Sequence, residues 1–119
     1  MAQKILVVDD NFEDLFTVRT ILEKNNYKVS IATNASEALE ILDANGFDLV
    51  LLNIKMPIIS GYDAVKLIRG TKRHKNAKIV YISILPKAEV NLEGVNGFIQ
   101  KPFSPNNLIV EIKKQIMPK

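Results

Sequence analysis

The sequence feature that most constrains the fold is the alternation of short apolar runs with helical patterns. Five such runs occupy residues 5–8, 29–32 (the weakest), 48–52, 78–83 and 97–100. Continuous apolar runs of this length are typical of parallel strands that are buried on both faces. Strands that alternate with helices predict right-handed crossovers and an α/β sandwich of three layers.

Apolar residues between these runs follow the i, i+3, i+4, i+7 spacing of amphipathic helices. The spacing occurs in four segments, at Leu15, Val18, Leu22; at Ala35, Ala38, Leu39, Leu42; at Gly61, Ala64, Val65, Ile68; and at Leu108, Ile109, Ile112, Ile116. Capping residues agree with these helix starts, namely Asn34 with Glu37, Ser60 with Asp63, and Ser104 before Pro105. One segment, residues 84–96, has weak helical periodicity, so we expect the fourth of five helices to be short or partly unwound.

Composition limits the kind of protein this can be. The chain has 119 residues, 47% hydrophobic and 24% charged, which suits one globular domain over residues 1–119. The absence of cysteine excludes disulfides, thiolate metal sites and cysteine nucleophiles. No apolar run approaches the ~18–20 residues of a membrane span, and acidic residues follow the N-terminus too soon for a signal peptide. We therefore expect a cytoplasmic protein without membrane contact.

The net charge of +3 is mild, but positive residues gather in one stretch. The members of this basic cluster are Arg69, Lys72, Arg73, Lys75 and Lys78. We interpret the stretch as a solvated loop, because no aromatic or nucleic-acid-binding motif accompanies it, and we expect no direct nucleic-acid binding. His74 lies in the same stretch without a carboxylate or a second histidine nearby in sequence, and is interpreted as a surface residue.

Polar side chains follow the predicted strands at their carboxyl ends, where open parallel sheets bind ligands. They are Asp9, Asp10, Asn53, Ser83 and Lys101. Adjacent carboxylates suit a hard cation such as Mg²⁺, and a hydroxyl with an ammonium suits a phosphoryl group. The set lacks a nucleophile, because the amide oxygen of Asn53 is neutral and its nitrogen lone pair is delocalised.

Five pieces of the sequence, in order and at matching spacing, carry a family resemblance. They are ILVVDDN at residues 5–11, LVLLNIKMP at 49–57 followed by Gly61, Ser83, Phe98 three residues before Lys101, and KPF at 101–103. The chain resembles the receiver domains of response regulators in two-component signalling over nearly its whole length. The resemblance implies a flavodoxin-like sheet of five parallel strands in the order 2-1-3-4-5.

The resemblance also implies roles for the strand-end residues. Asn53 takes the phosphoacceptor position, Asp9 and Asp10 form the acidic pocket, and Lys101 is the lysine of the phosphoryl pocket. Ser83 and Phe98 take the two switch positions. The Lys101–Pro102 peptide is expected to be cis.

A metal site is implied in the same way. Receivers hold Mg²⁺ with one carboxylate of the acidic pair, the acceptor carboxylate and a backbone carbonyl. Here Asp10, the oxygen of Asn53 and the carbonyl of Lys55 would serve, with Asp9 acting through water. We expect Mg²⁺ binding to be weak, because the pocket has lost one negative charge.

Three departures from the receiver pattern concern the same mechanism, by which a receiver accepts and senses a phosphoryl group. Asn53 replaces the phosphorylated aspartate, Ile84 stands where receivers usually have a small residue, and the segment between Ser83 and Lys101 is several residues short. Together they favour natural degeneration over a single engineered change.

Several functions remain open from the sequence. The first is a non-enzymatic signalling module that is not phosphorylated and acts by binding proteins, either a sensor kinase or a downstream effector. The second is an ordinary phosphorylatable receiver with an engineered aspartate-to-asparagine change at position 53. A small phosphate-ester hydrolase is disfavoured, because it needs an aspartate two residues after the nucleophile, and Asn11 follows Asp9 there. A flavin or nucleotide binder is disfavoured by the lack of a phosphate-binding glycine loop.

Overall fold

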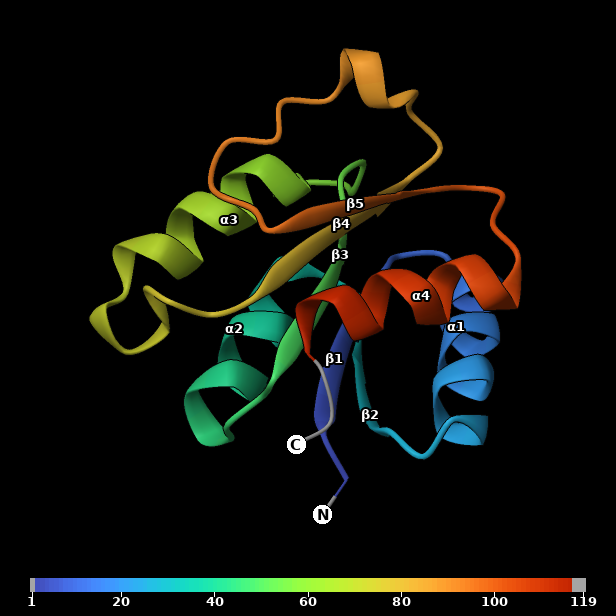
Figure 1. Cartoon of the computed structure of the whole chain (residues 1–119). Helices are drawn as coiled ribbons and strands as arrows, with labels where there is room; N and C mark the ends of the chain where they lie inside the picture. The colour runs from blue at the N-terminus through green and yellow to red at the C-terminus, as the bar shows by residue number, and fades with distance from the viewer. Residues whose placement is uncertain (1, 117–119) are drawn as a thin grey trace.

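The computed structural model describes residues 2–116, which form a sheet of five parallel strands covered by helices on both faces (Figure 1). The elements in chain order are β1 (Lys4–Val8), α1 (Phe12–Lys24), β2 (Lys28–Ala32), α2 (Ala35–Ala44), β3 (Leu49–Asn53), α3 (Gly61–Gly70), β4 (Ile79–Ser83), β5 (Gly97–Gln100) and α4 (Pro105–Gln115). No helix in this part of the chain is long and apolar enough to cross a bilayer.

The strand order is β2-β1-β3-β4-β5, which confirms the predicted flavodoxin-like topology. The register brings the polar strand ends together. Val8 pairs with Leu52, so the next residues, Asp9 and Asn53, come level at the carboxyl edge of the sheet. On the other side, Ser83 pairs with Gln100, and the backbone N–H of Lys101 donates to the carbonyl of Ser83 over 2.7 Å.

The core is divided by the sheet into two apolar clusters. Helices α1 and α4 cover one face, where Leu15, Leu22 and Leu108 are fully buried. Helices α2 and α3 cover the other face (Figure 1). There Leu42 and Ile68 belong to the second apolar cluster, together with residues of the strands. All five residues of β3 and of β4 are buried, as the continuous apolar runs predicted.

The helices begin at the predicted capping residues. Asn34 accepts from the N–H of Glu37, whose carboxylate accepts from the N–H of Thr33, so both halves of a capping box are present. Ser60 and Ser104 cap α3 and α4 through one hydrogen bond each, accepted by the serine side chain from the N–H of the third residue on. Helix α1 is capped by Asn11, whose side chain accepts from the N–H of the third residue on.

The connection from β4 to β5 contains no α-helix. Its only helical part is a single 3₁₀ turn, Lys87–Glu89, which confirms the prediction of a short fourth helix. Leu85, Val90, Leu92 and Val95 of this connection are partly buried against the cluster under α2 and α3. Residues 84–96 are called the β4–β5 connection below.

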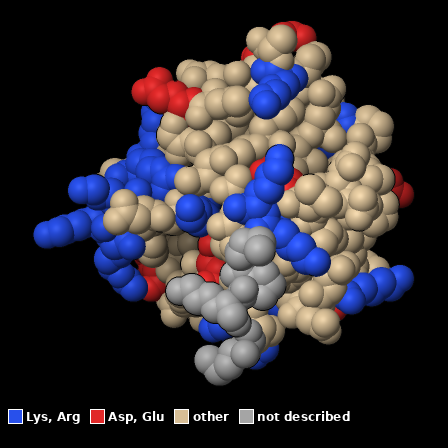
Figure 2. Space-filling model, viewed as in Figure 1, with Lys and Arg blue, Asp and Glu red and all other residues tan. Residues whose placement is uncertain are grey.

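The interpretation of the basic stretch was partly wrong. Lys72, Arg73, Lys75 and Lys78 are exposed, and Figure 2 shows basic side chains gathered on the side of α3 and the loop that follows it. Arg69, however, belongs to α3 and donates five hydrogen bonds. His74 has a side chain only 11% exposed and lies 2.9 Å from the carboxylate of Asp43. Asp43 is 31 residues away in sequence, which is why no local pattern indicated it.

Candidate functional site

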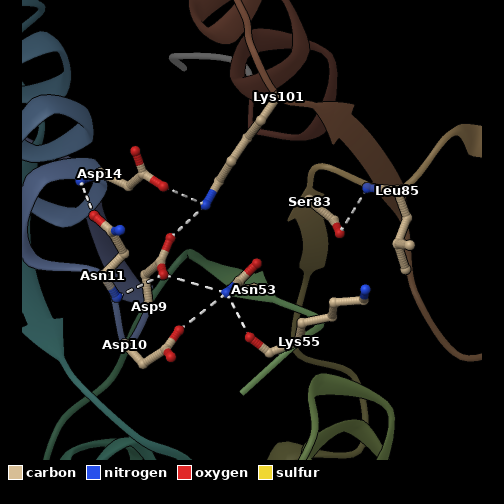
Figure 3. Close-up of polar contacts among 9 residues, drawn as sticks. All are labelled: Asp9, Asp10, Asn11, Asp14, Asn53, Lys55, Ser83, Leu85 and Lys101. Carbon is tan, nitrogen blue, oxygen red and sulfur yellow. Dashed lines mark hydrogen bonds and ion pairs between the residues drawn. The ribbon is translucent and has the colours of Figure 1, made fainter. Parts of the chain in front are cut away.

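The site lies at the carboxyl edge of the sheet, between β1 and β3 (Figure 3). Asp9 directly follows β1 and is 2% exposed, and Asn53 ends β3 and is 8% exposed. Asp10, the next residue after Asp9, is exposed to solvent. The two central strands therefore place one carboxylate and one amide side by side in a largely buried position, with a second carboxylate at the surface.

The amide nitrogen of Asn53 is the centre of the hydrogen bonding. It lies 2.9 Å from the carbonyl oxygen of Lys55, 3.2 Å from Oδ1 of Asp9 and 3.3 Å from Oδ1 of Asp10 (Figure 3). All three neighbours are acceptors only, so the amide must present its nitrogen and not its oxygen to them. Two N–H groups serve three acceptors, so at least one N–H is shared between two of them.

Lys101 reaches the same pocket from the end of β5. Its Nζ lies 2.7 Å from Oδ2 of Asp9 and 2.8 Å from Oδ2 of Asp14. Burial acts to lower the pKa of Lys101, but the hydrogen bonds and charges of Asp14 and Asp9 outweigh it, and the pKa is raised. The lysine is therefore held as a cation by two carboxylates. The Lys101–Pro102 peptide is cis, as predicted.

Asp14 was not among the predicted site residues. It lies in the first turn of α1, where acidic residues are common because they complement the helix dipole, so its presence carried no separate signal. Its partner Lys101 is 87 residues away in sequence. The pairing could only come from the packing of the β5–α4 loop against the start of α1.

The predicted switch residues lie apart from the Asn53 contacts. Ser83 is fully buried at the end of β4, and its hydroxyl accepts from the N–H of Leu85 over 3.2 Å (Figure 3). Phe98 is half-buried and packs against the cluster under α2 and α3. Of the predicted site residues, the structure thus gathers Asp9, Asp10, Asn53, Lys55 and Lys101, and leaves Ser83 and Phe98 engaged with other neighbours.

The loop after β3 is held tightly against Asn53. The N–H of Gly61 donates to the carbonyl of Ile54 over 2.7 Å. A Cβ atom at this glycine would lie 2.4 Å from the carbonyl oxygen of Asn53, so no other residue fits without moving the strand end. From the sequence, Gly61 was placed on the apolar face of a helix and in the motif that follows residues 49–57. Its second role is to permit this close approach.

One residue of the same loop has an unfavourable backbone conformation. Ile58 has a φ of 70° and a fully exposed side chain. A β-branched residue rarely adopts a positive φ, because its side chain is crowded by the following carbonyl.

Within residues 2–116, no three His, Cys, Asp or Glu side chains form a group that could by itself hold a metal ion.

Comparison with known proteins places this geometry in a family. The family model of the response regulator receiver domain matches residues 5–113. The nisin biosynthesis regulatory protein NisR of Lactococcus lactis is 39% identical over 98% of this chain. The CAI-1 autoinducer sensor kinase/phosphatase CqsS of Vibrio cholerae is 36% identical over 92% of it. The chain spans 51% of the length of NisR and 17% of CqsS.

Solved structures agree with the sequence comparison. The chemotaxis protein CheY4 of Vibrio cholerae superposes with a TM-score of 0.92, at 27% identity, over 98% of this chain and 100% of that one. The response regulator TrrA of Thermotoga maritima, solved in complex with Mg²⁺ and BeF, superposes with a TM-score of 0.87, at 30% identity, over 96% and 99% of the two chains. This chain belongs to the response regulator receiver domain family of two-component signalling.

Proposed function

We propose that this chain is a receiver-type signalling module that is not phosphorylated at position 53 and acts by binding other proteins. The observation that supports this most directly is the side chain of Asn53, which takes the acceptor position beside the acidic pair. Phosphorylation of a receiver forms an acyl phosphate, which requires an anionic oxygen in line with the phosphorus. Asn53 offers a neutral amide, and its nitrogen is turned toward Asp9, Asp10 and Lys55.

The neighbouring carboxylates are poor substitutes as acceptors. Both oxygens of Asp9 are occupied, because Oδ1 accepts from the N–H of Asn11 and the amide of Asn53, and Oδ2 accepts from Lys101. Asp10 is more open but bonds the same amide. A carboxylate whose lone pairs are already engaged attacks phosphorus slowly, so we expect no efficient transfer to either residue.

Signalling without a covalent switch requires differential binding. A partner shifts the population of conformations only to the extent that it binds one of them more tightly than another. The predicted switch residues Ser83 and Phe98 and the pocket lysine Lys101 would take part in such a change, and these roles stay predictions. The partners we propose are a sensor kinase or a downstream effector, in line with the regulator and kinase names of the relatives. The cytoplasmic location and the lack of enzymatic activity also stay predictions.

The test uses a small phosphoryl donor. After incubation with acetyl phosphate and Mg²⁺, the intact mass of this chain should stay unchanged. The matched control is Asn53→Asp, which restores the nucleophile without altering the shape of the side chain. That variant should gain one hydroxylamine-labile phosphoryl group if the rest of the site is competent.

The two arms separate the open alternatives. A phosphoryl adduct on the unaltered chain, mapped to Asp9 or Asp10, would refute the proposal. An Asn53→Asp variant that stays inert would support natural degeneration that includes Ile84 and the β4–β5 connection. A variant that is readily phosphorylated would favour an otherwise intact receiver that differs at one residue.

A further inference from the structure

The amide nitrogen of Asn53 is surrounded by oxygens that the receiver resemblance assigns to a metal. The carboxylate of Asp10 and the carbonyl of Lys55 are two of the expected Mg²⁺ ligands, and Asp9 is expected to act on the metal through water. The nitrogen contacts all three, at 3.3, 2.9 and 3.2 Å respectively. The group that gathers these oxygens in this structure is therefore the amide itself.

We infer that Asn53 Nδ2 takes the place of the divalent cation, so that this receiver holds its acidic pocket together without a metal. The inference deepens the proposed function and rests on it, since it concerns the same unphosphorylated site. It differs from the loss of one ligand charge expected from the sequence. A lost charge weakens metal binding. An amide in the cation's position blocks metal binding altogether, and it takes over the cation's role of holding the oxygens together.

The contacts of the carboxylates support a blocked site. Oδ2 of Asp9 is held by Lys101, and Oδ1 of Asp9 accepts from both the backbone N–H of Asn11 and the amide of Asn53. Asp9 thus accepts three hydrogen bonds from donors that carry positive charge or partial charge. What remains for a metal is the exposed carboxylate of Asp10 and one carbonyl. Mg²⁺ can complete its coordination shell with water, but the position between these oxygens is taken by the amide nitrogen of Asn53, which offers a cation no oxygen ligand.

The orientation of the amide adds a second barrier. The carbonyl oxygen of Asn53 lies on the side away from Asp10 and Lys55 (Figure 3). To ligate a metal, the amide would have to rotate and present this oxygen to the pocket, which breaks all three of its hydrogen bonds. After rotation, the acceptors of the pocket would have no donor unless a cation replaced the nitrogen. Leaving them unpaired costs free energy, so rotation and metal binding must occur together.

Removal of the amide distinguishes a blocked site from a weakened one. Asn53→Ala takes away a potential ligand, so if ligand number alone limits metal binding, this variant binds Mg²⁺ no better than the unaltered chain. If the amide occupies the cation's place, Asn53→Ala opens that place beside Asp9 and Asp10. The variant should then bind Mg²⁺ more tightly than the unaltered chain, despite having fewer ligands.

The experiment follows thermal unfolding of the 119-residue chain in EDTA and in millimolar MgCl₂. The unaltered chain should have the same midpoint in both. Asn53→Ala should melt lower in EDTA and recover in MgCl₂, and Asn53→Asp should show the largest rise in MgCl₂. Asn45→Ala, which removes an exposed amide at the far end of α2, controls for general salt effects and should show no Mg²⁺ response.

Two results would overturn the inference. One is an unaltered chain whose midpoint rises with Mg²⁺ as much as that of Asn53→Asp, and the other is an Asn53→Ala variant that folds but ignores Mg²⁺. If Asn53→Ala does not fold, ¹⁵N NMR of the unaltered chain decides the matter, since the Asn53 side-chain amide signals should not move on Mg²⁺ titration, and a saturating shift would contradict the claim. A phosphoryl adduct would instead refute the proposed function while leaving these melting curves as they are.

Discussion

The connections that follow β3 and β4 pack on the same face of the sheet but are stabilised in different ways. The connection after β3 contains α3, which buries Ala64, Val65 and Ile68 on one face and is capped by Ser60. The β4–β5 connection has one 3₁₀ turn and no fully buried side chain. Figure 1 shows it as a long loop that passes over α3.

Side chains of α3 compensate for the missing helix. The guanidinium of Arg69 donates to the carbonyl of Gly94 over 3.0 Å and to the side-chain oxygen of Asn96 over 3.3 Å. The same group donates to the carbonyl of Ala77 over 2.6 Å, and the hydroxyl of Tyr62 accepts from the N–H of Asn91. A helix satisfies its own backbone groups, whereas the β4–β5 connection depends on donors and acceptors from α3.

The largest expected effect comes from removing Arg69. Arg69→Ala should lower the free energy of unfolding by about 3 kcal/mol, because it removes five hydrogen bonds and leaves two partly buried carbonyls without a charged donor. Chemical denaturation of both proteins measures the difference. The matched control is Arg73→Ala, which removes an exposed arginine with one bond to the carbonyl of Asp43 and should cost less than about 1 kcal/mol. Equal losses would show that Arg69 has no special role in joining the two connections.

A smaller difference is expected in local stability. Backbone amides of residues 86–96 should exchange with solvent at least about tenfold faster than those of α2, on the order of 1.4 kcal/mol less protection, because few apolar contacts hold the connection. Hydrogen exchange read by mass spectrometry measures both segments in one sample. In Arg69→Ala, exchange in residues 86–96 should speed up further relative to α2. Equal protection of the two segments would remove the distinction between the connections.

The smallest effect concerns Ile58, the residue with a positive φ in the connection after β3. Ile58→Asn should raise the free energy of unfolding by about 1 kcal/mol, since asparagine tolerates a positive φ and the exposed isoleucine loses no burial. Ile84→Asn is the matched control, because Ile84 is also exposed and has no positive φ, and it should change stability by less than about 0.5 kcal/mol. A destabilised Ile58→Asn would mean that the isoleucine makes a contact that offsets its backbone strain.

Local signals were sufficient for most of the fold. Apolar periodicity predicted each strand and helix, because burial on one or two faces repeats along the chain. Weak periodicity over residues 84–96 predicted the unwound connection in the same way. Strand order and the cis Lys101–Pro102 bond followed from the family resemblance. Long-range polar pairs were not predicted, as Asp14 with Lys101 and Asp43 with His74 show, since a charged side chain carries no local mark of its partner.

Position 53 separates what the sequence determined from what only the tertiary structure decided. The sequence by itself determined that the acceptor position lacks a nucleophile, because that is a property of the asparagine side chain alone. Only the tertiary structure decided how the amide is turned. Its direction depends on Asp9, Asp10 and the carbonyl of Lys55, which the sheet register and the loop after β3 bring together as three acceptors. The sequence determines which donor and acceptor atoms a side chain has. The neighbours that surround the side chain in the folded protein determine which of these atoms faces the pocket.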